Sequence, residues 1–252
     1  MAQYDRQTLD ARAGSALAID EGLRSYMLRV YNYMGLGLVV TGLVAFFAYR
    51  FAAPNGALID ANGNFVTAVG AALYGSPLSF VVMLAPLAFV LVLSFGINKL
   101  SVPAAQGIFW AFAAVMGLSL SSIFLVYTGG SIAKVFFITA ATFGAMSLYG
   151  YTTKRDLTGI GNFLIMGLIG LIIASLVNIF LQSGPLDFAI SAIGVLIFVG
   201  LTAYDTQKIK ESYSASYGAD VMAKNAIMGA LSLYMDFINL FLMLLRLFGN
   251  RE

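Results

Sequence analysis

Asp236 is the residue of this sequence best placed to do chemistry, because it lies inside a run apolar enough to cross a membrane. The run, residues 233–248, reads LYMDFINLFLMLLRLF, and a second carboxylate, Asp205, ends the apolar run before it. A charged aspartate at the centre of a bilayer costs ~2.5 to 3.5 kcal/mol on insertion scales, so a chain that keeps one there usually has a partner or a use for it. The two aspartates are therefore the first candidates for a functional site.

The two carboxylates could meet, because the apolar runs that carry them are consecutive and would pack as an antiparallel hairpin. Positions 205 and 236 are equidistant from about Asp220, which lies in the turn-like stretch SYSASYGAD. A helix that continues to about Tyr213 and another that starts near Asn225 would leave the two aspartates offset by about one turn. The hypothesis that follows is a contact between the two side chains.

Two carboxylates within a few ångströms of each other cannot both ionise cheaply, so they would share one proton. The protonated pair could join two helices through a hydrogen bond, whereas the ionised pair would repel itself or attract Ca²⁺, which prefers hard oxygen ligands. The chain has no histidine and no cysteine, so a proton sensor must be built from carboxylates. We predict Asp205 and Asp236 as pH sensor and gate, with protons and Ca²⁺ as ligands and no cofactor.

A narrow polar stripe on the last apolar run supports this interpretation. At about 100° per residue, Asp236 shares one arc of a helix with Gly229, Ser232, Asn239, Met243 and Arg246. Lipid would penalise the polar members, so the stripe should face the bundle interior or a water-filled path. Four residues are predicted to line or support the pore: Ser232, Asn239, Arg246 and Tyr204.

Simpler interpretations of the same residues stay open. Asp205 could lie at the membrane boundary and pair with Lys208, three positions further on. Arg246 could extend its charge to the interface near the outer end of its helix. Two membrane aspartates also occur in intramembrane aspartyl proteases, but Asp236 lies in YMDF and lacks the glycine-flanked context of such enzymes. We therefore do not predict an enzyme.

The elements that must position these residues are membrane helices. Hydrophobic residues make up 60% of the chain and charged residues only 10%, whereas about a quarter of the residues in soluble domains are charged. The apolar runs lack the alternation typical of membrane β-barrels. A net charge of +2 is too small to indicate a nucleic-acid partner. The predicted fold class is an all-α polytopic membrane protein, with the lipid bilayer as its partner.

Seven stretches approach the ~20 residues that a membrane-spanning helix needs. They are residues 30–49, 78–97, 104–127, 132–149, 160–181, 188–204 and 227–248. Lys134 interrupts the fourth, and the helical-looking TQKIKES could extend the sixth. Gly170 and Ala174 form a small-xxx-small pair suited to close helix contact. We predict a seven-helix membrane domain over residues 28–252, with the last helix at its centre.

Residues 1–27 are polar and lack the pattern of a cleavable signal peptide. We predict a cytoplasmic tail with a short amphipathic segment. Ten of the 14 lysines and arginines fall on the side of this tail if there are seven spans. The positive-inside rule then places the amino terminus in the cytoplasm and the carboxyl terminus outside. DANGNF, residues 60–65, begins like a calcium loop but lacks its glycine and glutamate, and we interpret it as a surface turn.

The sequence ends with two distinctive segments, GLTAYDTQKIK at 200–210 and LYMDFINLFLMLLRLFG at 233–249. In this order they resemble the Bax inhibitor-1 family, also called the transmembrane BAX inhibitor motif family. The similarity covers nearly the whole chain from IDEGLRSYM at 19–27, including APLAFVLVLSFG at 85–96. The resemblance implies a seven-helix bundle with a central last helix in the inner membrane of a bacterium. It also implies a pH-sensitive calcium leak regulated by a di-aspartyl pair, which maps onto Asp205 and Asp236.

The leading functional hypothesis is therefore a proton-regulated calcium leak. The alternative is a regulatory membrane protein without a channel that modulates a membrane protease or a stress response, since some bacterial relatives are linked to such a protease. The polar tail and the connection from Lys208 to Lys224 would then be the contact surfaces. Some family members carry a basic residue in the second span near the pair, whereas residues 78–97 of this chain contain none.

Overall fold

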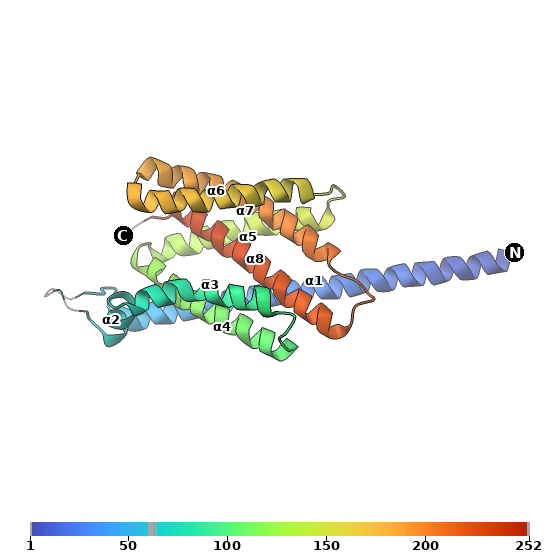
Figure 1. The fold of residues 1–252 in the computed structure, drawn as a ribbon, viewed down its shortest axis with the longest axis horizontal. Coiled ribbons are helices and arrows are strands. Elements are labelled where there is room, and N and C mark those ends of the chain that lie inside the picture. Colours follow the sequence, from blue (N-terminus) through green and yellow to red (C-terminus); the bar gives the residue numbers. More distant parts are fainter. Residues whose placement is uncertain (1, 60–62, 64, 251–252) are drawn as a thin grey trace.

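The chain folds into a bundle of long helices (Figure 1). A computed structural model describes the backbone of residues 2–59, 63 and 65–250, and the side chains from residue 21 onward. The elements are α1 (Ala2–Ala52), α2 (Ala68–Tyr74), α3 (Leu78–Gly96), α4 (Val102–Leu120), the 3-10 helix η1 (Ser121–Leu125), α5 (Gly129–Thr152), α6 (Thr158–Leu181), α7 (Gly184–Glu211) and α8 (Ala219–Phe248). None of these described residues forms a strand, and the predicted all-α fold is confirmed.

Seven helices of the described part are long and apolar enough to cross a membrane, as predicted. The candidate spans are Glu21–Ala52, Leu78–Gly96, Val102–Leu125, Gly129–Thr152, Thr158–Leu181, Gly184–Glu211 and Ala219–Phe248. The fourth is a regular helix of 24 residues in spite of Lys134. TQKIKE extends α7 to Glu211, as the sequence suggested.

The structure corrects one predicted helix boundary and bears on two further predictions. α8 begins at Ala219, so the predicted start near Asn225 is wrong by six residues. α1 is continuous from Ala2, so the predicted boundary between tail and membrane domain falls within one helix. The segment 60–65, interpreted as a surface turn, lies mostly outside the described residues.

α8 is the central helix of the bundle. It crosses the bundle diagonally (Figure 1) and contacts α1, α4, α5 and α7. In its most apolar stretch 67% of the residues are buried, against 44% for α7 and at most 28% for the other spans. The prediction of a central last helix is therefore confirmed.

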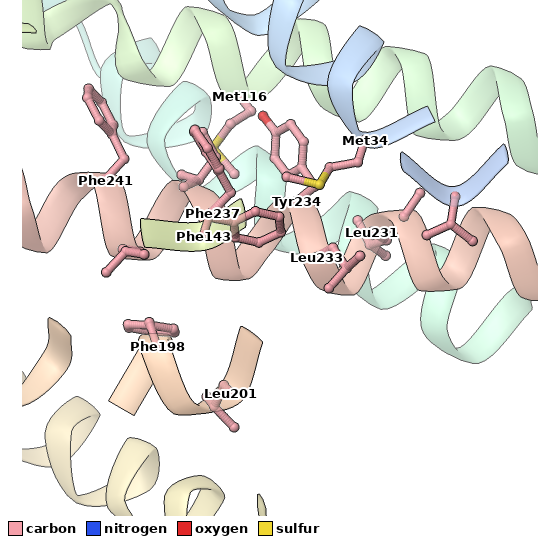
Figure 2. Close-up of a cluster of buried hydrophobic side chains, with 14 of the residues drawn as sticks. Met34, Met116, Phe143, Phe198, Leu201, Leu231, Leu233, Tyr234, Phe237 and Phe241 are labelled. Atoms are coloured by element: carbon pink, nitrogen blue, oxygen red, sulfur yellow. The ribbon is translucent and has the colours of Figure 1, made fainter. Parts of the chain in front are cut away.

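The core around α8 is rich in aromatic side chains. Figure 2 shows Tyr234 and Phe237 among Met116 and Phe143, which come from α4 and α5. The rings of Phe143 and Phe237 meet edge to face with centroids 5.5 Å apart. Such close packing stabilises the bundle, because membrane helices are held together by van der Waals contact more than by the removal of apolar surface from water.

A buried hydroxyl pair fixes α8 against α1 and α4. Thr41 Oγ1 lies 2.7 Å from Tyr234 Oη, 2.8 Å from the carbonyl oxygen of Ala113 and 2.9 Å from that of Gly37. Thr41 has only one hydroxyl proton, which it donates to a carbonyl, so Tyr234 donates to Thr41. One threonine on α1 therefore links three helices.

Glycines allow the closest helix contacts, but not at the predicted position. A Cβ at Gly170 would meet nothing within 4 Å, so this residue does not pack against another helix. A Cβ at Gly150 of α5 would instead overlap the backbone carbonyl of Ala203 on α7, and one at Gly161 of α6 would overlap the ring of Tyr204. α7 therefore lies against α5 and α6 at positions where only glycine fits.

Gln207 ties the connection between α5 and α6 to α7. Its Oε1 accepts a hydrogen bond from the Leu157 N–H at 2.8 Å, and its Nε2 donates to the Arg155 carbonyl at 2.8 Å. Beside it, hydrogen bonds from the hydroxyl and the N–H of Thr158 lower the pKa of the exposed Asp156. The two hydrogen bonds of Gln207 hold the start of α6 against α7 and fix the position of α7 along its axis relative to this connection.

Candidate functional site

The side chains of Asp205 and Asp236 meet between α7 and α8. Their carboxyl groups lie within hydrogen-bonding distance of each other. Asp236 is near the middle of α8 and is 5% exposed, whereas Asp205 is half-buried less than two turns before the end of α7. A carboxylate only accepts hydrogen bonds, so a bond between the two groups requires a proton on one of them.

Apart from Asp205, the neighbours of Asp236 offer few hydrogen bonds to its carboxyl group. Its Oδ2 is buried and receives no hydrogen bond from a hydroxyl, amide or cationic group of the described residues. The adjoining turns of α8 place buried apolar residues, including Leu233, Phe237 and Leu240, around it. Because an unsatisfied buried charge is unfavourable, this oxygen is suited to bind a proton or a cation.

Lys208 is the cation closest in sequence to the pair, one turn after Asp205. It acts on Asp205 electrostatically, and its Nζ lies 5.9 Å from the ring centroid of Tyr204. The two side chains do not form an ion pair, since the single ion pair of the described residues joins Arg246 to Asp187. Asp205 therefore remains available to Asp236, and α3 contributes no basic residue to the site.

A groove of about 250 Å³, lined by both polar and apolar residues, reaches Asp205 from the end of the bundle where α7 and α8 are connected. We call it the α7–α8 groove, and it is lined by Asp205, Lys208, Ile209, Ser212, Asn225, Met228, Gly229 and Ser232. Hydroxyl, amide, ammonium and carboxylate groups in this lining can hold water or a hydrated cation. Asp236 does not line the groove, so a cation that enters meets Asp205 first.

The structure brings only some of the predicted supporting residues to the pair. Ser232 lines the α7–α8 groove, and Asn239 is half-buried one turn beyond Asp236. Tyr204 packs on α6 at Gly161 rather than along the groove.

Arg246 lies far from the acid pair, although the helical arc predicted that it would support the pore. It is exposed in the last turn of α8, where its Nη1 lies 3.8 Å from Asp187 Oδ1 in the first turn of α7. Ten residues separate it from Asp236, which corresponds to ~15 Å along a helix. The polar stripe is therefore divided between two ends of the bundle.

Hydroxyl groups that sequence reasoning missed tie α1 to the helices around the site. Tyr26 Oη lies 3.1 Å from Ser212 Oγ, which belongs to the wall of the α7–α8 groove. Tyr31 Oη lies 2.5 Å from Ser147 Oγ, which lies 3.0 Å from Thr206 Oγ1 on α7. Serine, threonine and tyrosine within apolar runs were the available signal, but their spacing does not indicate which helix each one faces.

Comparison with known proteins finds relatives that match nearly the whole chain. A family model described as inhibitor of apoptosis-promoting Bax1 matches residues 23–252. The chain is 50% identical over 243 residues to the inner membrane protein YbhL of Escherichia coli, which covers 96% of this chain and 98% of YbhL. It is 48% identical over 233 residues to a protein of Rickettsia prowazekii, with 92% of each chain covered. It is 39% identical over 236 residues to a membrane protein of Streptococcus pyogenes, with 92% and 96% covered.

Proposed function

Since the chain belongs to the Bax inhibitor-1 family of membrane proteins, we propose that it is a pH-sensitive calcium leak of the bacterial inner membrane, regulated by Asp205 and Asp236. The observation that carries this proposal is the contact between two carboxyl groups, one buried and one in the lining of the α7–α8 groove. Protons and Ca²⁺ compete for the same oxygens in such a site.

Proton binding sets the state of the pair. With one proton, one carboxyl donates a hydrogen bond to the other, and the pair joins α7 to α8. Without it, two like charges within hydrogen-bonding distance repel each other. The repulsion is relieved either by separation of the two helices or by a divalent cation, for which carboxylates are preferred ligands. Calcium flux therefore depends on pH.

The α7–α8 groove supports a route for the ion from one end of the bundle. Beyond Asp236, aromatic side chains pack α5 against α8: the ring centroids of Phe136 and Phe237 are 5.4 Å apart, and those of Phe136 and Phe241 are 6.3 Å apart. The groove does not continue past the pair, so conduction requires α8 to move. A helix held by a protonated carboxyl pair is suited to that control.

Calcium efflux from liposomes loaded with a calcium dye tests the proposal. The wild-type protein should release Ca²⁺ at rates that differ between acidic and alkaline buffer. Asp205→Asn and Asp236→Asn should each abolish that difference, because neither can form the titrating pair. Asp187→Asn, which changes a carboxylate at the far end of α7, should leave it intact.

Two results would contradict the proposal. An unchanged pH dependence in both asparagine variants would remove the pair from the mechanism. Absence of wild-type flux at every pH, with correctly inserted protein, would exclude the leak.

A second candidate function, regulation of a membrane partner such as a protease, is favoured by the shape of α1. This helix continues to Ala2 and projects well beyond the rest of the bundle (Figure 1). A projecting helix is suited to docking. Deletion of residues 2–20 should abolish co-purification of a partner if this function holds, whereas a leak through α7 and α8 should survive the deletion.

A further inference from the structure

A second groove, separate from the candidate site, opens between α1 and α5. Its volume is about 800 Å³, which falls in the range of ~300 to 1,000 Å³ typical of small-molecule sites. Apolar side chains such as Leu28 and Leu148 line most of its length, while Arg24 and Tyr151 lie at one end. We call it the α1–α5 groove. The groove is therefore apolar along most of its length and polar and basic at the end with Arg24 and Tyr151, which we call its mouth.

Two glycines leave space in the α1–α5 groove. Gly35 of α1 and Gly144 of α5 both line it, and a Cβ on either would meet nothing within 4 Å. Gly150, six residues further along α5, differs because the backbone of Ala203 occupies the space beside it. Helix packing therefore explains Gly150 but does not explain Gly35 or Gly144, whose effect is to keep the groove open.

Positive charge gathers at the mouth of the groove. Among the residues whose side chains the structure describes, Arg24 forms no ion pair and no acidic residue lines the groove. Lys210 approaches the same end from α7, where its Nζ donates to the Tyr151 carbonyl at 2.7 Å and lies 5.1 Å from the Tyr151 ring centroid. Glu21, whose side chain is described, lines a neighbouring groove together with Arg24.

We propose that the α1–α5 groove binds one anionic glycerophospholipid, with its phosphate at Arg24 and an acyl chain against Gly35 and Gly144. From Arg24 to Gly35 the groove follows α1 for ~16 Å, at 1.5 Å per residue. Charge lies at the bundle end and apolar surface lies toward the middle, which matches the orientation of a lipid in its leaflet. Basic residues at the membrane surface attract anionic headgroups. A free phosphate would leave the apolar length of the groove unused.

Lipid in this groove would lie against the hydroxyl chain that leads to α7. Tyr31 and Ser147 both line the groove, and Ser147 hydrogen-bonds to Thr206 next to Asp205 in the chain. The lipid site is nevertheless independent of the proposed leak, since it is defined by its own residues on α1 and α5.

Native mass spectrometry of the detergent-purified chain tests the proposal, with titration of phosphatidylglycerol, phosphatidylethanolamine or inorganic phosphate. One phosphatidylglycerol should bind per chain in preference to phosphatidylethanolamine. Arg24→Gln should weaken phosphatidylglycerol binding by about fivefold, the factor that corresponds to ~1 kcal/mol for one basic residue. It should weaken phosphatidylethanolamine binding less, because the ammonium group of that lipid offsets the charge of its phosphate. Gly144→Leu should weaken both lipids, because it fills space that the acyl chain needs.

Two variants serve as matched controls. Arg29→Gln removes an arginine of α1 that does not line the groove, and Gly170→Leu adds a side chain at an open glycine of α6. Neither should change lipid binding, and thermal unfolding should verify that all variants are folded. Equal phosphatidylglycerol binding in wild type, Arg24→Gln and Gly144→Leu would overturn the proposal. Binding of inorganic phosphate as tight as that of phosphatidylglycerol would do the same.

Discussion

The two aspartates differ in access, although they form one site. Asp205 borders the α7–α8 groove, whereas Asp236 is 5% exposed and lies behind it. A proton or cation from that end of the bundle therefore reaches Asp236 by way of Asp205. The proposed regulation therefore requires both residues: Asp236 without its partner would be a buried charge without compensation, and Asp205 alone would be a carboxylate in the wall of the groove.

At the residue scale, Gln207→Leu should destabilise the protein by about 1 to 3 kcal/mol, the cost of leaving buried polar groups without partners. The variant removes both the acceptor of the Leu157 N–H and the donor to the Arg155 carbonyl. Thermal unfolding in detergent should show a lower midpoint for Gln207→Leu. Lys154→Ala, at an exposed position in the same connection, should not change it. Equal midpoints for the two variants would show that these bonds contribute nothing.

At the element scale, the sequence predicted all seven spans because apolar length alone decides whether a helix can cross a bilayer. It misplaced the start of α8, because residues 219–225 include Asp220 and Lys224 and fall outside the apolar run although they continue the helix. α2 is only seven residues long and gave no comparable signal.

Contacts between elements were harder to predict than the elements. The helical arc grouped Ser232, Asp236 and Arg246 along α8, but it could not reveal that α8 crosses the bundle diagonally (Figure 1) and that Arg246 lies beside Asp187. Likewise, glycine spacing pointed to Gly170, whereas the close contacts occur at Gly150 and Gly161. Which face of a membrane helix meets protein depends on its neighbours, and a single sequence does not contain that information directly.

Gly150→Ala should therefore weaken the contact between α5 and α7. Its Cβ would overlap the Ala203 carbonyl, and backbone cannot move aside as a flexible side chain can. Overpacking of this kind typically costs about 1 to 3 kcal/mol. Gly144→Ala on the same helix is the matched control, because its Cβ enters open space. A lower unfolding midpoint for Gly150→Ala than for Gly144→Ala is expected, and the reverse order would contradict the described packing of α5 on α7.

At the scale of the whole molecule, the seven candidate spans of the described residues predict that the two termini lie on opposite sides of the membrane. The distribution of lysine and arginine predicts which side is which: the end that carries the amino terminus should be cytoplasmic. The α7–α8 groove and the mouth of the α1–α5 groove then both open toward the cytoplasm. Calcium and anionic lipid would reach the protein from the same compartment.

Reporter fusions test this orientation. Alkaline phosphatase fused after Asn250 should be active, because that enzyme folds outside the cytoplasm, and a green fluorescent protein at the same position should remain dark. Fusion of each reporter in the connection between α5 and α6, residues 153–157, should give the opposite pattern. The opposite result at both positions would invert the orientation and turn both grooves outward.

The central claim is that Asp205 and Asp236 meet, and the chain allows a direct test because it contains no cysteine. The double variant Asp205→Cys with Asp236→Cys would carry a protease site in the connection 212–218. After membranes are treated with an oxidant, or with Hg²⁺ to bridge a slightly wider gap, the site is cut and the fragments are separated without reductant.

The pair Asp205→Cys with Leu242→Cys is the control, since its second thiol lies ~9 Å further along α8. In the variant with Asp205→Cys and Asp236→Cys, the two fragments should stay joined until a reductant is added. In the control variant, they should separate without a reductant. Fragments that separate equally in both variants would contradict the contact, and with it the proposed regulation by the pair.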